Sequence, residues 1–189
     1  MPKGKVYLLP SNLTPGGNPA EVLPARNIQL VSTIKYFVVE ELRTARRFLK
    51  ACDRRIDIDS LHFDVLNEHT APEQVSMMLK PALEGNDIGV ISEAGCPAVA
   101  DPGADLVAAA QANGVEVVPL VGPSSIIMSL MASCFNGQSF AFIGYLPIDA
   151  KNRSAALKQM SSDISARHQT QIFIETPYRN NRLIAELAS

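Results

Sequence analysis

The chain has 189 residues, of which 47% are hydrophobic and 19% charged, so it can bury a core and is too apolar to be largely disordered. Its formal charge of −2 argues against a protein that coats nucleic acid non-specifically. No stretch approaches the roughly 18 consecutive apolar residues of a membrane span, and the three cysteines are too widely spaced to suggest metal ligands. We therefore expect a cytoplasmic protein with reduced thiols, no membrane association and no bound metal.

The first part of the chain alternates predicted strands and helices. Residues 5–10 and 36–39 are short apolar runs typical of buried strands, and a loop rich in proline, glycine and asparagine follows the first run. Residues 40–51 change to helical spacing, and a second helix is predicted over 72–83. A third strand is predicted over 88–91.

A third helix is predicted from Asp101 to Gly114. Asp101 is expected as its N-cap, Pro102 lies in its first turn, and Gly114 closes its far end. A strand over 115–120 follows it. Short links between alternating strands and helices are typical of a parallel α/β sheet.

The last third carries an apolar helix over 124–134, strands over 140–146 and 171–174, and a polar helix from about residue 151 to 165. We place a domain boundary near residues 120–123. The prediction is therefore two α/β domains, residues 1–121 with a mainly parallel sheet and residues 122–189 with a smaller mixed sheet.

Several common catalytic and nucleotide-binding motifs are absent from the sequence. It contains no G-x-G-x-x-G after the first strand and no P-loop, which disfavours dinucleotides and nucleoside triphosphates. It also lacks G-x-S-x-G and H-E-x-x-H, so neither a serine hydrolase nor a zinc enzyme is supported.

Two turns of small residues follow predicted strands, at the edge where open α/β sheets bind ligands. In the first, Ala94 and Gly95 remove side-chain bulk where a ligand could lie against the backbone. In the second, Ser124 and Ser125 place hydroxyl groups at a helix start. From the residues alone, both turns suit simple tight strand-to-helix connections equally well.

Ordered motifs across about residues 5 to 187 resemble the tetrapyrrole-methylase-like (class III) S-adenosylmethionine methyltransferases. The similarity is strongest to the branch that methylates the 2′ oxygen of a ribose in 16S ribosomal RNA. The segments that carry it are Ile88–Gly103, Val39–Thr44, Leu66–His69, Val117–Ser124, Phe142–Pro147 and Ile172–Arg179.

The resemblance implies that S-adenosylmethionine binds in a cleft between the two domains and that the protein is a homodimer. It also implies the residues that contact this methyl donor, which are Leu13, Ala94, Gly95, Cys96, Val99, Ser124, Ser125 and Glu175. A ligand with an adenine, a ribose and a sulfonium cation needs backbone hydrogen bonds, a flat apolar slot and negative potential.

The sequence departs from the family pattern at several places. Cys96 stands where threonine is usual, Glu93 where aspartate is usual, and Tyr178 where histidine is usual. The first loop has a shifted glycine. Members of the family continue well past the position of Ser189, so the last strands of the second domain are missing if the chain ends there.

A basic run on the 40–51 helix is the densest cluster of cations in the chain. Arg43, Arg46 and Arg47 are therefore candidate contacts to RNA phosphates, although a solvated helix face explains them as well. Arg179, in the last family motif, is a further candidate contact to the RNA. Glu40 and Glu41 begin the same helix, where the helix dipole favours a carboxylate.

Methyl transfer to a hydroxyl group requires alignment of the acceptor and removal of its proton. A carboxylate beside the Ala94–Gly95 turn suits that role, so Glu93 is the first candidate catalytic residue and Glu68 the second. Glu93 could instead only brace the turn through backbone hydrogen bonds.

The predicted function is methyl transfer from S-adenosylmethionine to a ribose of 16S ribosomal RNA, with the RNA or the small ribosomal subunit as partner. Two alternatives stay open: a tetrapyrrole C-methyltransferase of the precorrin type, and a donor-binding module without catalysis.

Overall fold

The computed structural model describes residues 2–67 and 69–188. They form two compact units, which are divided between Ser125 and Ile126. The boundary predicted from the sequence lies four residues earlier, after residue 121. Each unit has its own sheet, and we describe them separately.

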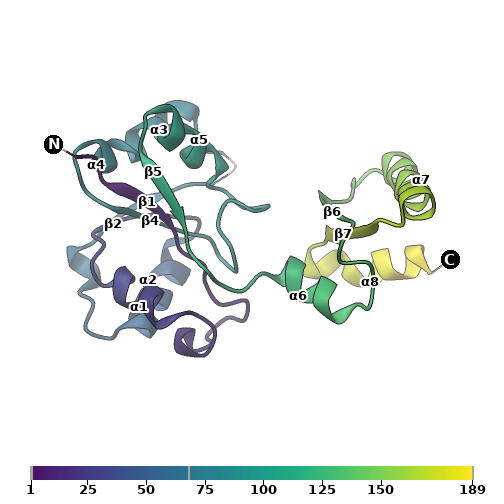
Figure 1. Ribbon diagram of the computed structural model, residues 1–189, viewed down its shortest axis with the longest axis horizontal. Helices are drawn as coiled ribbons and strands as arrows, with labels where there is room; N and C mark the ends of the chain where they lie inside the picture. The colour runs from purple at the N-terminus through teal and green to yellow at the C-terminus, as the bar shows by residue number, and fades with distance from the viewer. Residues whose placement is uncertain (1, 68, 189) are drawn as a thin grey trace. The chain divides into compact units, whose positions relative to one another are not determined.

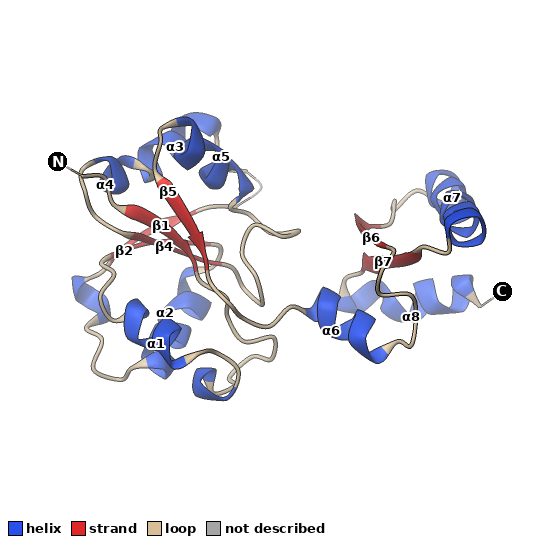
Figure 2. Cartoon of the chain, in the orientation of Figure 1, coloured by secondary structure: helices blue, strands red, loops and turns tan. Residues whose placement is uncertain are grey.

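The first unit is built on a five-stranded sheet in the order β3-β2-β4-β1-β5 (Figures 1 and 2). Every strand pair in it is parallel, as the sequence predicts. Its strands are β1 (Lys5–Leu8), β2 (Tyr36–Val39), β3 (His62–Val65), β4 (Ile88–Ile91) and β5 (Glu116–Pro119). The predicted α/β fold class is confirmed.

Helices cover both faces of this sheet (Figure 1). One face carries α3 (Pro72–Met78), α4 (Lys80–Leu83) and α5 (Ala104–Ala112), and the other carries α1 (Ala25–Val31) and α2 (Leu42–Cys52). Two single turns, Pro19–Glu21 and Ile58–Ser60, form 3₁₀ helices.

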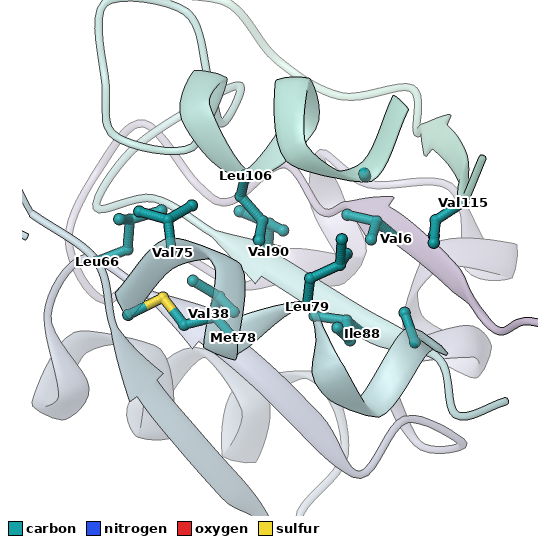
Figure 3. Packing of buried hydrophobic residues seen from close by; sticks show 12 residues of the cluster. Val6, Val38, Leu66, Val75, Met78, Leu79, Ile88, Val90, Leu106 and Val115 are labelled. Carbon is teal, nitrogen blue, oxygen red and sulfur yellow. The ribbon is translucent and has the colours of Figure 1, made fainter. Parts of the chain in front are cut away.

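Two buried clusters hold these layers together, because successive side chains of a strand point to opposite faces. On β2, Val38 packs with α3, α4 and α5, whereas Phe37 and Val39 pack with α1 and α2. Figure 3 shows the first cluster, in which Leu79 and Leu106 meet the strand residues Val6 and Val38.

Gly89 in the middle of β4 makes room for a neighbouring aromatic ring. A Cβ atom at this position would lie 2.7 Å from Leu9 Cδ1 and 2.8 Å from Phe37 Cε1. Only glycine therefore allows Phe37, which is 1% exposed, to pack across the central strand.

Two predicted helices differ from the structure in a way that affects the site or the core. The 72–83 helix is broken at Leu79, because Pro81 cannot donate the hydrogen bond that would continue α3. The 101–114 helix begins only at Ala104, and its N-cap is Gly103 with a φ of 127° rather than Asp101. Asp101 is thus free of the capping role that the sequence predicted.

The second unit contains α6 (Ser125–Ala132), which spans the boundary, with β6 (Phe140–Tyr145), α7 (Ala150–Arg167), β7 (Thr170–Ile174) and α8 (Pro177–Leu187). Its two described strands pair in parallel, so the antiparallel pairing expected of a mixed sheet is not found between them. The side chains of Leu146 and Leu183 are buried here, together with Arg153.

Arg153 joins two helices of the second unit. Its guanidinium donates to both Glu186 carboxylate oxygens at 2.8 Å, and to the carbonyls of Pro147 and Ile148 at 3.1 and 2.7 Å. These charge-assisted bonds satisfy the donors of a buried cation.

Candidate methyl-donor and acceptor site

Hydrogen bonds join the loop that follows β1 to the loop that follows β4. The two strands are neighbours and parallel, so their carboxyl ends meet at one edge of the sheet. There the Ser11 N–H donates to the Gly95 carbonyl at 2.9 Å, and Ser11 Oγ donates to the Ser92 carbonyl at 3.4 Å. The two loops predicted to contact the donor therefore form one continuous surface.

A cavity of about 520 Å³ opens beside this surface. Its walls are residues 11–17 with Pro19 from the first loop, residues 91–94 from the end of β4, and one face of α2. The residues of that face are Thr44, Arg47, Phe48 and Ala51, at the spacing of side chains that share one side of a helix. The cavity lies at the carboxyl edge, where ligands bind in this class of fold.

The two glutamates before α2 have separate roles. Glu41 is the N-cap, and its carboxylate accepts a hydrogen bond from Thr44 N at 2.6 Å. The backbone N–H groups of Arg43 and Thr44 lower the pKa of Glu41. Glu40 turns instead toward β4, where its Oε2 accepts from the Glu93 N–H at 3.1 Å. Glu40 thus holds the backbone at the start of the predicted donor turn.

Two side chains in the cavity wall carry polar atoms without a hydrogen-bond partner among the described residues. They are Ser92 Oγ and Asn12 Oδ1, and both atoms are buried. Ser92 as a whole is only 4% exposed. Buried hydroxyl and amide oxygens are rarely left unpaired, so these atoms mark places where a ligand could bond.

The 94–96 turn packs closely against the segment that follows β5. Gly95 has a φ of 75°, and a Cβ atom there would lie 3.1 Å from Leu13 Cδ2 and 3.4 Å from the Pro123 carbonyl oxygen. Cys96 Sγ donates to the same carbonyl at 3.4 Å. Burial raises the pKa of the Cys96 thiol, which keeps it a neutral donor.

The backbone that follows this turn is strained at two alanines. Ala98 and Ala100 both have left-handed conformations, with φ of 65° and 59°. Such conformations are costly for alanine and persist where the surrounding structure enforces them, often at functional sites. They lead to Asp101, which is half-buried.

Asp101 has a strongly shifted pKa. Burial raises it most, and the nearby charge of Glu40 raises it further, to about 6. The Glu93 charge adds a smaller rise. Three carboxylates, Glu40, Glu93 and Asp101, therefore create negative potential at this edge of the sheet.

The structure brings part of the predicted site together. Leu13, Ala94, Glu93 and Arg47 all line the cavity, although they come from three separate segments. Glu93 is exposed to solvent within it. Glu68, the second candidate for catalysis, lies outside the described residues.

The remaining predicted donor contacts of the first unit lie around the same turn. Gly95 and Cys96 face Pro123, which immediately precedes the partly buried Ser124. Val99 is 48% exposed, and Ser125 is exposed at the first residue of α6.

The three candidate RNA-binding arginines of α2 lie in different environments. Arg47 lines the cavity. Arg46 lies over the Phe63 ring of β3, with its guanidinium carbon 5.4 Å from the ring centre. Arg43 is exposed on the same helix. Of these three arginines, Arg47 is therefore the one placed beside the cavity, and the other two extend the basic surface along the helix.

Two residues of the second unit that were predicted to contact ligands are paired with each other. Arg179 Nε donates to Glu175 Oε1 at 2.7 Å, and Thr176 N donates to the same oxygen at 2.7 Å. Burial works to raise the pKa of Glu175, but the bonds from Thr176 and Arg179 outweigh it and lower the pKa. Glu175 was predicted to contact the donor and Arg179 the RNA; here each is the partner of the other.

Sequence reasoning did not single out Asn12, Glu40, Ser92 or Asp101 for this site. A usable indication existed for two of them, because Glu40 and Ser92 are polar residues directly after buried strands. Asp101 was assigned to capping, and the unpaired oxygen of Asn12 depends on how the first loop folds back.

Comparison with known proteins agrees with this arrangement, although no family model matches the chain. The chain is 32% identical over 177 residues to the ribosomal RNA small subunit methyltransferase I of Halalkalibacterium halodurans, covering 94% of this chain and 57% of that protein. The protein of the same name from Micromonospora olivasterospora is 33% identical, covering 98% of this chain and 55% of the relative.

The chain is a homologue of these methyltransferases. The resemblance predicted from the sequence motifs is confirmed by this relationship, which also includes the enzyme of Vibrio cholerae at 32% identity over 92% of this chain. The chain spans little more than half the length of these methyltransferase relatives.

A solved structure shows the same fold. The uroporphyrin-III C-methyltransferase of Thermus thermophilus matches with a TM-score of 0.50 at 20% identity, over 76% of this chain and 64% of that one. The chain thus has a tetrapyrrole methylase fold. Among its described helices, none is both long and apolar enough to cross a membrane.

Proposed function

We propose that this chain is an S-adenosylmethionine-dependent methyltransferase that methylates the 2′ oxygen of a ribose in 16S ribosomal RNA. The observation that carries the proposal is the similarity, over more than nine-tenths of the chain, to proteins named ribosomal RNA small subunit methyltransferase I. The cavity and the fastened turns at the carboxyl edge of the first sheet support it.

The residues at this edge fit the methyl donor. Gly95 allows the turn to pack closely against Leu13, since an added Cβ atom would lie 3.1 Å from Leu13 Cδ2. Asn12 and Ser92 have buried oxygen atoms available for a ligand's polar groups. The three carboxylates supply the negative potential that a sulfonium cation needs. When bound, S-adenosylmethionine supplies a methyl group that is already activated on a positively charged sulfur.

In this proposal the donor and the acceptor bind on different sides of the turn that follows β4. Gly95 and Cys96, with Leu13 and Ser124, hold the donor. The α2 side of the cavity receives the acceptor, where Thr44 offers a hydroxyl group and Arg47 a cation for an RNA phosphate. Exact alignment of a ribose hydroxyl with the methyl group is then the main catalytic task.

The test uses small ribosomal subunits from cells that lack this protein. Incubation with donor carrying an isotopically labelled methyl group should label 16S RNA, and mass spectrometry of nuclease fragments should find one ribose with an added methyl group. Labelling of a tetrapyrrole instead, or of neither acceptor, would overturn the proposed acceptor. By family analogy we also propose a homodimer, which sedimentation equilibrium of the purified chain tests.

A further inference from the structure

Glu40 connects the start of α2 to the neighbouring strand β4 and to the turn that follows it. Its backbone N–H donates to the Ile91 carbonyl at 3.3 Å, directly beyond the parallel pair of Val39 with Ile91. Its side chain reaches two residues further, where Oε2 accepts a hydrogen bond from the Glu93 N–H at 3.1 Å. Both the backbone and the side chain of this one residue therefore hold the end of β4.

The bond to Glu93 is not needed to begin helix α2. Glu41 is the N-cap of this helix, and its carboxylate accepts from Thr44 N at 2.6 Å. The helix dipole alone would favour a carboxylate at either glutamate. The carboxylate of Glu40 is instead bonded to the backbone of another segment. The two adjacent glutamates therefore have separate partners, one in the helix and one in the turn after β4.

Glu93 is the residue from which the donor turn, residues 94–96, begins. The far side of this turn is held by the first loop, because the Ser11 N–H donates to the Gly95 carbonyl at 2.9 Å. The near side is held from α2, by the bond between the Glu40 carboxylate and the Glu93 N–H. A hydrogen bond to a carboxylate is stronger than one between neutral groups. Two different segments thus fix the position of the donor turn.

We propose that Glu40 is a positioning residue for methyl transfer, because its carboxylate fixes the donor turn relative to α2. The proposal rests on the proposed function, in which Gly95 and Cys96 hold the donor while Thr44 and Arg47 of α2 receive the acceptor. A misplacement of about 1 Å between reacting groups can slow a reaction by about a hundredfold. A bond that joins the donor side to the acceptor side therefore affects the rate as well as donor affinity.

Two variants of similar size separate the hydrogen bond of Glu40 from the bulk of its side chain. Glu40→Gln keeps an oxygen atom that can accept from the Glu93 N–H, whereas Glu40→Met fills similar space without a strong acceptor. Glu41→Met is the matched control, because it makes the same change at the adjacent glutamate and removes the cap of α2 but not the bond to the turn. Circular dichroism checks that each full-length variant is folded.

The first test needs neither donor nor RNA. Exchange of the Glu93 amide hydrogen with water, followed by NMR, measures how firmly the N–H is held in the ligand-free chain. Exchange should be about fivefold or more faster in Glu40→Met than in the wild type, and nearly unchanged in Glu40→Gln and Glu41→Met. Equal exchange in Glu40→Met and the wild type would overturn the role of Glu40.

The second test measures donor binding and methyl transfer to small ribosomal subunits. Glu40→Met should weaken S-adenosylmethionine binding by about tenfold, and should lower kcat at saturating donor by about tenfold or more, because the turn is no longer fixed. Glu40→Gln should restore most of both, with a loss of affinity below about threefold from the missing negative charge. Glu41→Met should lower the thermal midpoint but change donor affinity by less than about twofold.

The proposed function and the role of Glu40 fail in different ways. Wild-type donor affinity and kcat in Glu40→Met would show that Glu40 has no positioning role, and the proposed function would stand. A Glu40→Gln variant as impaired as Glu40→Met would assign the effect to charge, which also contradicts positioning through the hydrogen bond. A wild-type chain that binds no S-adenosylmethionine would overturn the proposed function and the donor role of Glu40 together, even if the Glu93 amide exchanges faster in Glu40→Met.

Discussion

The two units of the chain are stabilised in different ways. The first encloses a parallel sheet between two helical layers, with a buried apolar cluster on each face. In the second, the buried side chains among the described residues are Leu146, Leu183 and Arg153, and the cation is matched by Glu186. The first unit thus has an extensive apolar core, whereas the few buried side chains of the second include an ion-paired arginine.

The difference explains why the clearest candidate site belongs to the first unit. One of its loops leaves β4, which is buried along its whole length, and a backbone hydrogen bond between Ser11 and Gly95 joins this loop to the one after β1. A site needs such rigid support to hold reacting groups in place. In the second unit, α6 has no buried residue among those described, and Met131 on it is 79% exposed.

Truncating one apolar side chain in each unit gives the largest expected contrast. Leu79→Ala removes a 1%-exposed side chain from the first cluster and should lower the free energy of unfolding by about 2–5 kcal/mol. Ile184→Ala, at a position 63% exposed in α8, should cost less than about 1 kcal/mol. Urea unfolding followed by circular dichroism measures both; equal costs would contradict the comparison.

Asp101→Asn should remove the free-energy cost of holding an ionised carboxylate at this half-buried position of the first unit. The folded chain holds the Asp101 proton up to about pH 6, whereas an unfolded aspartate releases it near its ordinary pKa of 3.8. Stability from this group is thus complete below about pH 3.8 and is lost as the pH rises through 6.

The asparagine variant carries no such charge, so it should gain about 1 kcal/mol over the wild type at pH 8, after allowance for solvent screening. The gain should vanish near about pH 3.5. Urea midpoints at the two pH values measure it. A gain of the same size at both would show that ionisation of Asp101 is not its cause.

Removing equal charge from the two units tests which one binds RNA phosphates. Replacing Arg43, Arg46 and Arg47 with alanine should reduce the salt dependence of RNA binding by about one in slope for each phosphate that is no longer neutralised. The matched variant replaces three basic residues of α7, which are Lys151, Lys158 and Arg167. Filter binding over a range of salt concentrations compares them, and identical slopes would return the α2 cluster to an ordinary solvated helix face.

The sequence predicted most of the first sheet because its strands are strongly apolar. Residues 36–39 and 88–91 were placed correctly, since these strands are buried on both faces. Strand β3 was missed because it lies at the sheet edge, where His62 and Asp64 are exposed and the apolar pattern is weak. Helices α1 and α8 were missed too, and each presents few buried side chains.

The sequence predicted which segments form the site better than it predicted which side chains interact there. The motifs placed Leu13, Glu93 and Ala94 in one region, and they do share a cavity. That Asp101 does not cap α5 could not be predicted, because the two alanines shortly before it adopt left-handed conformations that no propensity favours. The pairing of Glu175 with Arg179 was equally hidden, although their spacing of four residues suits a helix turn.

Titration calorimetry with S-adenosylmethionine decides whether the Gly95 turn of the first unit binds the methyl donor. Gly95→Val crowds Leu13 Cδ2 and the Pro123 carbonyl oxygen and should weaken binding by about tenfold or more, because the turn must move from the conformation that holds the donor. Gly144→Val is the matched control, because Gly144 has a similar φ of 70° but no atom within 4 Å of an added Cβ. We expect wild-type affinity for Gly144→Val and a large loss for Gly95→Val; wild-type affinity in Gly95→Val would rule out the proposed donor turn.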